Sequence, residues 1–541
     1  MSTAPSSAAD LAGHRARRIG LAGIAVALAV VVGFPLFDLL RTAVDALDDG
    51  GGQALRSGGG AAVWNSVWTG AAATALAMVI GVAGALLTER VGGPGTGALR
   101  IGMMLPLLVP PFVTALGWTR AFGPGGLSDD TFGLTLPGLI GPAGIVVVTA
   151  VHVAPLVYAV AAAALATRAR PELEWAARAS GAGPVTAFAQ VTGPLLTPAL
   201  LGGGALAFVA SVNSFGIPAV LGIPAGFPTI TTRIYQDLAR SAEPAAFSRV
   251  VVLATTLLII AVAAVAAGDA ATRRGIPPRP GASHEPARTG RRGRRASAAA
   301  WTYLVVAAAL PVAALVLTGL TKAVGLPATP GNWTLANFGE ALGSDVWGPA
   351  GRSLLLAAAA ATIATVLGIV LAVVSRRGAT RGFATAAALT FAVPGSALAV
   401  AVLLAWGPWL RDTLLIILLA YLAKFWALAH RTVDGSVGSL DADVIHAGRA
   451  SGAGPYAVTR RILLPLLRPA VAAAWLLVFL FGLHELTMSS LLYGPGTDTL
   501  AVVTLNVQQL GDITVTSSLA VLLTVPGVLA AVPLLRRRSR R

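Results

Sequence analysis

The sequence predicts an all-α polytopic membrane protein with about 12 transmembrane helices, arranged as two repeated six-helix halves. Hydrophobic residues make up 55% of the 541 residues and charged residues only 11%, and the mean hydropathy is +0.77. This composition is too apolar for a soluble domain of this length. An internal repeat gives the second observation, because ARASGAGP at residues 177–184 recurs as GRASGAGP at residues 448–455, 271 positions later.

Apolar runs of about 20 residues, long enough to cross a ~30 Å hydrocarbon core, recur along the chain. In the first half we expect spans near residues 19–40, 66–88, 101–118, 144–166, 196–221 and 247–267. In the second half we expect them near residues 301–320, 354–375, 384–406, 414–429, 467–493 and 515–535. The predicted division is a first half at 1–268, a basic cytoplasmic linker at 269–300 and a second half at 301–541.

The net charge of +16 comes from arginines that flank the spans, without clusters of interleaved aromatic residues. This distribution predicts membrane topology and argues against nucleic-acid binding. Placing the N-terminus in the cytoplasm puts most Lys and Arg residues on that side, so both termini are expected there. The first span is expected to be an uncleaved anchor. The linker carries eight arginines among Pro, Gly and Ser and is predicted to be a flexible tether, with binding of anionic lipid head groups as an alternative.

Several kinds of chemistry are excluded by the residues themselves. The absence of cysteine excludes disulfides, thiolate metal sites and cysteine nucleophiles. The two lysines, Lys322 and Lys424, do not lie in a Gly-x-x-x-x-Gly-Lys-Ser/Thr loop, so the chain is not expected to hydrolyse ATP. No carboxylate pair, metal cluster or catalytic triad is evident. We therefore expect neither an enzyme nor a chain that binds its own cofactor or metal.

The repeated polar segment lies between apolar spans and predicts a compact cytoplasmic loop. In the first copy Pro171 opens a helix, and Gly181 is expected to form a left-handed corner that ends it. A second short helix then opens at Pro184 and is expected to end before Pro194, where the chain re-enters the membrane. The second copy repeats this pattern around Gly452. An ordinary helical loop is the competing interpretation, but it does not explain why both halves retain the same residues.

These residues resemble a known family. LEWAARASGAG followed by VTGPLLTPAL resembles the EAA loop of ABC-importer permeases of the type I fold, whose usual form is Glu-Ala-Ala, three residues, Gly and then Ile-x-Leu-Pro. The resemblance implies that each loop docks in a groove of a separate ATPase subunit. It assigns that role to Glu174, Trp175, Ala176, Ala177, Gly181 and Pro194, and to His446, Ala447, Gly448, Gly452 and Pro465.

The loops also depart from the usual pattern. Trp175 and His446 stand where the motif has glutamate, with Glu174 one residue earlier in the first copy. Gly448 replaces the second alanine, and Gly193 replaces the leucine before Pro194. The family implies a cytoplasmic ATP-binding cassette ATPase dimer, an extracytoplasmic solute-binding protein and location in a bacterial cell membrane. ATP would be bound by the partner ATPase.

Polar residues inside spans are costly and are candidates for function. At the 271-residue offset, Asn213 and Ser214 in the fifth span correspond to His484 and Glu485 in the eleventh. We expect these four residues to line or gate a solute pathway. Hydrogen bonding between helices is the alternative, most strongly for Asn213 and Ser214. Lys424 is expected to be structurally satisfied or to extend toward the membrane surface.

The cargo is suggested by a second resemblance. SVNSFGIPAVLGIP, TTRIYQDL and LHELTMSSLLYGPGTDTL are similar to fused two-half permeases of the ferric-iron importer group. This similarity implies ferric iron, with thiamine, phosphonate, polyamine and sulfate as alternatives within the ABC class. A secondary transporter driven by an ion gradient is the alternative of another class. In it, Glu485 and Lys424 would be proton or ion sites.

Overall fold

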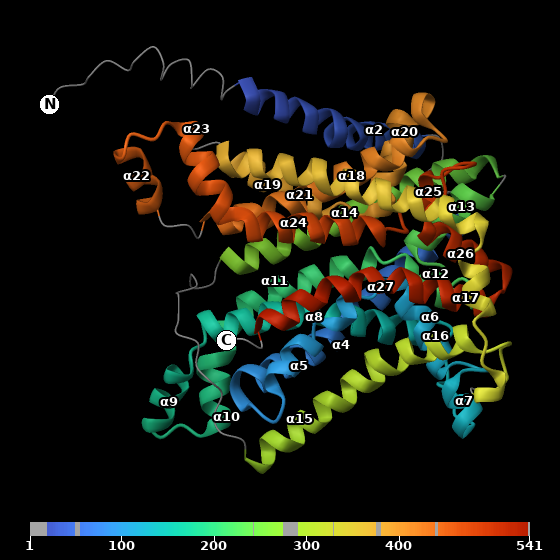
Figure 1. The fold of residues 1–541 in the computed structure, drawn as a ribbon, viewed down its shortest axis with the longest axis horizontal. Coiled ribbons are helices and arrows are strands. Elements are labelled where there is room, and N and C mark those ends of the chain that lie inside the picture. The colour runs from blue at the N-terminus through green and yellow to red at the C-terminus, as the bar shows by residue number, and fades with distance from the viewer. Residues whose placement is uncertain are drawn as a thin grey trace. The chain divides into compact units, whose positions relative to one another are not determined.

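The structure is a computed structural model, and it describes residues 19–48, 55–241, 243–273, 290–327, 329–374, 380–438 and 442–538. Figure 1 shows helices joined by short connections throughout these ranges. The described residues form no β-strand and only one isolated bridge, between Thr321 and Trp333. The predicted all-helical fold is confirmed.

Nine helices in the described part of the chain are long and apolar enough to cross a membrane, and two bent helix pairs raise the number to eleven. The nine are Ile19–Leu47, Arg56–Val91, Pro142–Thr167, Pro184–Val212, Ala245–Arg273, Arg291–Leu320, Val346–Ala372, Leu414–Gly438 and Thr459–Leu483. The bent pairs are Thr96–Leu107 with Pro111–Phe132, and Thr385–Ala392 with Gly395–Leu410. The expected twelfth span corresponds to α27 (Ile513–Arg538), whose apolar segment is Ile513–Gly527.

One compact unit contains residues 1–49 and 348–502. Its helices are α2 (Phe34–Asp48), α18 (Ser344–Val374), α19 (Thr380–Ala392), α20 (Gly395–Leu410), α21 (Leu414–Gly438), α22 (Ala442–Ala450), α23 (Pro455–Val458), α24 (Leu464–Leu483) and α25 (Ser489–Leu492). The first helix of the chain, α2, packs on α20, where the Phe34 and Trp406 rings lie 5.6 Å apart. This unit therefore combines the first span of the first half with later spans of the second half.

The other unit contains residues 50–347 and 503–541. Its helices before the linker are α4 (Gly60–Leu86), α5 (Thr96–Gly102), α6 (Pro111–Phe122), α7 (Leu127–Phe132), α8 (Pro142–Thr167), α9 (Pro171–Ala179), α10 (Pro184–Ala187), α11 (Gly193–Val212), α12 (Gly216–Leu221), α13 (Ile230–Arg240) and α14 (Pro244–Arg273). After the linker come α15 (Arg291–Leu304), α16 (Leu310–Leu320), α17 (Ala336–Ala341), most of α26 (Leu500–Leu510) and α27. Here α16, the end of the first span of the second half, packs on α6 of the first half.

Small residues let the second and fourth spans of each half approach closely. A Cβ placed on Gly81 of α4 would lie 2.7 Å from the Val157 Cβ of α8. In the second half a Cβ placed on Gly368 of α18 would lie 3.0 Å from the carbonyl carbon of Ala429 in α21. Backbone contact of this kind stabilises helix pairs in membranes, where the hydrophobic effect does not drive helices together. The repeat therefore extends to the packing of the spans.

Three details differ from the sequence predictions. The second short loop helix does not end before Pro194, because α10 continues through a π-helical turn, Phe188–Thr192, into α11. Pro194 falls at the start of α11, where the wider turn has already shifted the hydrogen-bond register and a missing N–H is tolerated. The fifth and eleventh spans are not continuous, since α11 ends at Val212 and α24 ends at Leu483. The linker is helical at both ends, because α14 reaches Arg273 and α15 begins at Arg291, while residues 274–289 lie outside the described ranges.

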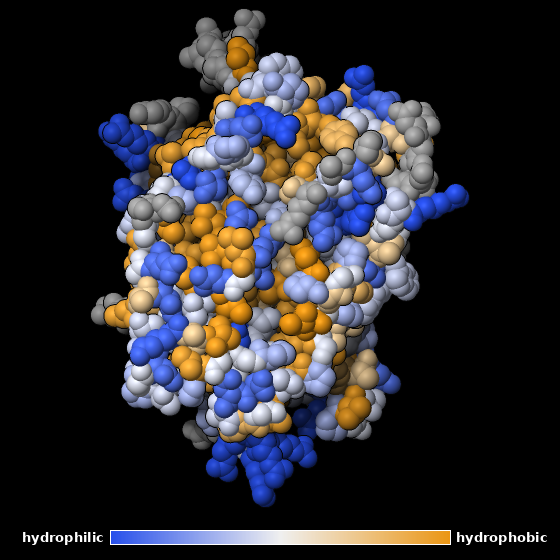
Figure 2. Space-filling view, turned by 90° about the vertical axis from the view of Figure 1, so that its right-hand side faces the viewer, coloured by the Kyte–Doolittle hydropathy of each residue, from blue (hydrophilic) through white to orange (hydrophobic). Residues whose placement is uncertain are grey.

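Short helices α7, α13 and α17 lie at the end of the molecule on the right of Figure 1. Figure 2 looks onto that end and shows hydrophilic side chains interspersed with hydrophobic ones. A surface that faced lipid would be apolar throughout. This end is consequently suited to water, and within the unit of residues 50–347 and 503–541 it lies opposite the first repeated loop, which contains α9 (Figure 1).

Candidate functional site

Each repeated loop contains a helix that ends at a glycine corner. At the end of α9 the Ala182 N–H donates to the Ala177 carbonyl at 3.1 Å, and the Gly181 N–H donates to the Arg178 carbonyl at 3.0 Å. These two bonds are the Schellman helix ending. Gly181 has a φ of +94°, and Gly452 in the second loop has a φ of +81°. Only glycine adopts this conformation at little cost, so the expected glycine corners are present in both copies.

The second loop repeats this backbone pattern around α22. The Ala453 N–H donates to the Gly448 carbonyl at 3.1 Å, and the Ser451 N–H donates to the Ala447 carbonyl at 3.0 Å. Ala447 lies on the exposed surface of this loop, and His446 lies within α22. The two loops therefore share one backbone shape even though their side chains differ.

Large apolar side chains are exposed on the first loop. Trp175 is 57% exposed, Leu173 is 44% exposed and Val185 is 82% exposed. On the second loop Val444 is 44% exposed. A protein that docks on either loop would therefore meet exposed apolar side chains.

Two polar contacts attach the first loop to the membrane helices. The carboxylate of Glu174 accepts a hydrogen bond from the buried hydroxyl of Thr192, which lies in the π-helical turn directly before α11. The guanidinium of Arg90, at the end of the second span, donates to the backbone carbonyl of Ala169, just before α9. Both contacts were missed by sequence reasoning. The repeat gives no signal for them, because the position of Thr192 is occupied by Leu463 in the second half.

The four predicted pathway residues lie where membrane helices end. Asn213 is the residue that follows α11, and His484 is the residue that follows α24. Ser214 and Glu485 come next in each half, before the short helices α12 and α25. The expected polar positions therefore follow equivalent helices in the two halves, and they lie at helix breaks and not in the middle of continuous helices.

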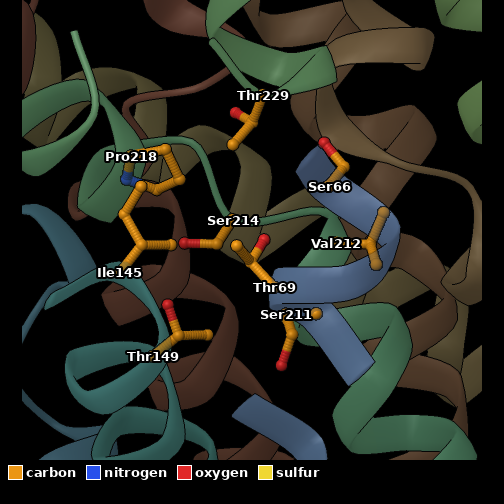
Figure 3. A pocket seen from close by; sticks show the side chains of 10 residues that line it. Ser66, Thr69, Ile145, Thr149, Ser211, Val212, Ser214, Pro218 and Thr229 are labelled. Carbon is orange, nitrogen blue, oxygen red and sulfur yellow. The ribbon is translucent and has the colours of Figure 1, made fainter. Parts of the chain in front are cut away.

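A small cavity lies beside the break in the first half (Figure 3). Its lining brings together six hydroxyl groups from three helices and two loops, those of Ser66, Thr69, Thr149, Ser211, Ser214 and Thr229. Figure 3 shows these side chains around a common space. The cavity volume that the centre of a water molecule could occupy is about 10 Å³. This is about the minimum volume that one bound water molecule needs.

Hydrogen bonding leaves several of these hydroxyls available to a guest. Thr69 and Ser211 each donate to the carbonyl one helical turn earlier, at 2.5 and 2.8 Å, which leaves their oxygen lone pairs free to accept. The hydroxyls of Thr149 and Ser214 are buried and have no hydrogen-bond partner within the described structure, and the same is true of the Asn213 amide oxygen. Buried polar groups are normally paired. The cavity is therefore suited to a small hydrogen-bonding species.

The helix break between α24 and α25 in the second half contains a carboxylate. The carboxylate of Glu485 accepts the backbone N–H groups of Met488 and Ser489, each at 2.9 Å, and the Ser489 hydroxyl at 3.2 Å. A carboxylate in this position stabilises the start of a helix. Glu485 therefore has a structural contact that the sequence did not reveal, in addition to its candidate role in the pathway.

A hydrogen-bonded staple occurs once in each half and was also missed. The Ile230 N–H donates to the Ser66 hydroxyl at 2.8 Å, and the Leu500 N–H donates to the Ser353 hydroxyl at 2.8 Å. The residue before each serine binds the adjoining loop as well. The Asn65 amide donates to the Pro228 carbonyl at 2.9 Å, and Arg352 donates to the Asp498 carbonyl at 2.8 Å. The offset at the serines is 287 residues and not 271. Aligning the two halves at the 271-residue offset of the loops therefore does not pair the two serines.

The family described as "Binding-protein-dependent transport system inner membrane component" matches residues 77–273 and 364–541. The chain belongs to this family. Both matched stretches contain a repeated loop and the helix break that follows it, so the permease family accounts for the duplicated features.

Three relatives show how far the similarity extends. The chain is 28% identical to the "Probable ABC transporter permease protein" of Sinorhizobium fredii, over 82% of this chain and 81% of the relative. It is 26% identical to the ferric transport system permease protein of Actinobacillus pleuropneumoniae, over 80% of this chain and 64% of the relative. The putrescine transport system permease protein of Escherichia coli is 31% identical over 33% of this chain and 68% of its own length. This permease is thus a multi-pass inner-membrane subunit of an ABC transporter.

No group of three or more His, Asp or Glu side chains within the described ranges of the permease could hold a metal ion. The coupling residues and the pathway residues form separate groups along the spans. Most of the predicted coupling residues lie on α9, α22 and the turns after them, while Pro194 and Pro465 lie in the first turns of α11 and α24; the predicted pathway residues follow the far ends of α11 and α24. One continuous helix in each half connects the two groups.

Proposed function

We propose that this permease imports ferric iron, delivered from outside by a solute-binding protein and driven by a separate ATPase dimer. The observation that carries the proposal is the similarity over 80% of the chain to a ferric transport system permease protein. Family membership supports the general partnership with an ATPase and a binding protein. In this proposal ATP is held by the ATPase, and the permease binds no cofactor.

The two repeated loops are the proposed contacts with the ATPase. Their support is the shared glycine corner, with φ of +94° at Gly181 and +81° at Gly452, and the exposed apolar side chain of Trp175. Because α10 is continuous with α11, a displacement of the first loop would be transmitted along one helix to the break at Asn213. Alternating access would follow if closing of the ATPase dimer drew the loops together.

The proposed solute pathway passes the breaks at Asn213 and Ser214 and at His484 and Glu485. The first half offers neutral hydroxyls around its cavity, and the second half offers one carboxylate. Neutral oxygens and a single carboxylate would hold a trivalent cation weakly. Weak binding suits a transport site, because such a site must release the solute that it binds. The proposed orientation places both termini and both loops in the cytoplasm.

Radiolabelled uptake in a strain that lacks this gene tests the cargo. We expect loss of ferric iron accumulation, with recovery when the intact gene is returned. Putrescine, thiamine, phosphonate and sulfate uptake are measured in parallel, because the Escherichia coli relative is a putrescine permease protein at 31% identity. Unchanged iron accumulation together with lost accumulation of one of the others would replace the cargo and retain the ABC importer class. Uptake that persists after the ATPase gene is deleted would favour a secondary transporter.

A further inference from the structure

Helix α15 begins with a cluster of exposed arginines. Four of its first five residues are arginines with exposed side chains, namely Arg291, Arg292, Arg294 and Arg295. The first turn contains no acidic residue, and no carboxylate in the described part of the chain forms an ion pair with any of the four. Positive charges at a helix N-terminus oppose the helix dipole. This arginine cluster therefore does not stabilise the helix that carries it.

The opposite face of α15 packs against the connection between the second and third spans. A Cβ placed on Gly293 would lie 2.6 Å from the Gly92 carbonyl oxygen, and one placed on Gly93 would clash with the Ser297 hydroxyl. Leu304, further along the same face, is also buried. Contacts this close fix the rotation of the helix about its own axis. They direct the arginine cluster away from the rest of this unit.

The exposed face of α15 continues into a surface that lipid would cover. The span Arg291–Leu320 has 30 residues, which is about 45 Å of helix, whereas the hydrocarbon core is ~30 Å thick. On the same side of the helix as the arginine cluster, Trp301 is 40% exposed, Val305 is 49% exposed and Val306 is 42% exposed. Tryptophan is enriched at the edge of the membrane. This arrangement puts the arginine cluster, about two turns before Trp301, at the level of the lipid head groups.

The chemistry of this face matches a phospholipid. A planar guanidinium can donate two parallel hydrogen bonds to phosphate oxygens, and basic clusters next to a membrane span attract anionic lipids. A soluble polyanion would contact the arginines alone. A phospholipid would contact both the arginines and the apolar surface that begins at Trp301. The combination of the two surfaces on one helix face favours a lipid.

We propose that the arginine cluster binds the phosphate groups of anionic phospholipids, and that bound lipid holds the start of α15 against the connection at Gly92 and Gly93. The arginines supply the charge, and Trp301 and Val305 contact the acyl chain. This site goes beyond the proposed transport function, and it depends neither on the identity of the cargo nor on the ATPase.

Lipid binding by the purified full chain tests the proposal. One variant replaces all four arginines by glutamine, and the matched control replaces them by lysine, which keeps the charge but not the paired donors. Each protein is titrated in detergent with phosphatidylglycerol or with phosphatidylcholine of the same acyl chains, and bound lipid is counted by native mass spectrometry. We expect the glutamine variant to bind phosphatidylglycerol about tenfold more weakly than the wild type, with the lysine variant in between. Phosphatidylcholine binding should be equal in all three.

Equal affinity of the wild type and the glutamine variant for phosphatidylglycerol would overturn the inference. An equal loss of phosphatidylcholine binding would also overturn it, because the site would then not recognise charge. A second measurement uses the wild type alone and so does not depend on how the variants fold. Photoreactive phosphatidylglycerol should cross-link within residues 291–306, and cross-links confined to other segments would contradict the site.

The other candidate partner of the arginine cluster is the ATPase. Co-purification of the ATPase is therefore measured for the wild type and for both variants. We expect the same amount of ATPase with all three proteins, because the cluster lies outside the two repeated loops. Loss of the ATPase from the glutamine variant, with phosphatidylglycerol binding unchanged, would assign the cluster to a protein contact and overturn the lipid site.

Discussion

The carboxylate of Glu174 accepts a hydrogen bond from the buried hydroxyl of Thr192. This contact fixes α9 to the π-helical turn from which the fifth span continues. The second half has Ile445 and Leu463 at the corresponding positions, so the tie exists in the first half alone. The residues at these two positions of the second half cannot make the same side-chain tie between loop and span.

Glu174→Ala should weaken the coupling of ATP hydrolysis to transport. Without its acceptor the Thr192 hydroxyl is left buried and unpaired, at a cost of about 1–3 kcal/mol of folding free energy. Glu174→Gln keeps an accepting oxygen and serves as the matched control. We expect less solute imported per ATP for Glu174→Ala in proteoliposomes, with Glu174→Gln near the wild type. An unchanged ratio for both would show that the tie has no part in coupling.

Gly181→Val together with Gly452→Val should abolish uptake while the protein stays in the membrane. A side chain in the left-handed region costs about 1–2 kcal/mol, more for a β-branched one, and reorients the loop. Gly183→Ala is the control, because Gly183 has an ordinary φ of −67° and a Cβ there would make only an ordinary contact, 4.0 Å from the Thr186 hydroxyl. Uptake and co-purification of the ATPase are measured for each. Normal uptake by the double valine variant would refute the docking role of the loops.

The proposed orientation predicts which positions an impermeant thiol reagent can reach. Cysteines at Ser180, Ser451 and Arg294, all exposed, should be protected in intact cells and labelled in inverted vesicles. Ser297 is unsuitable, although it lies in the same segment, because it is 2% exposed and packs against Gly93. Phe132→Cys, at the last residue of α7, whose side chain is 74% exposed, should be labelled in intact cells. Labelling at Ser451 from outside would invert the topology.

Glu485→Gln should lower ferric iron uptake several-fold and leave ATPase binding intact. The amide is isosteric and keeps one oxygen to accept the N–H groups of Met488 or Ser489, but it removes the negative charge beside the proposed pathway. The loops are remote in sequence and unaltered. Iron accumulation and ATPase co-purification are compared with those of the wild type. Loss of the ATPase from the purified complex would mean that the change disturbs the fold and not the pathway.

Local sequence predicted some site features well. The glycine corners at Gly181 and Gly452 follow from residues within one loop, because a left-handed position, its flanking helix and the proline that restarts the chain are all nearby in sequence. The same holds for the polar pairs after α11 and α24, which the repeat placed at matching positions. Their location at helix breaks was not predicted, because an apolar run has the same composition whether its helix is continuous or interrupted.

The sequence by itself determined the membrane environment, the helical content, the duplication and the shape of the loops, because composition and short-range backbone preference govern each of them. Tertiary structure alone decided that α2 packs on α20 and α16 on α6, that Thr192 meets Glu174, and that Lys424 reaches Val393. These contacts join residues of different helices, and in a membrane a buried polar group takes whichever partner the packing brings within reach, since water is not there to replace it.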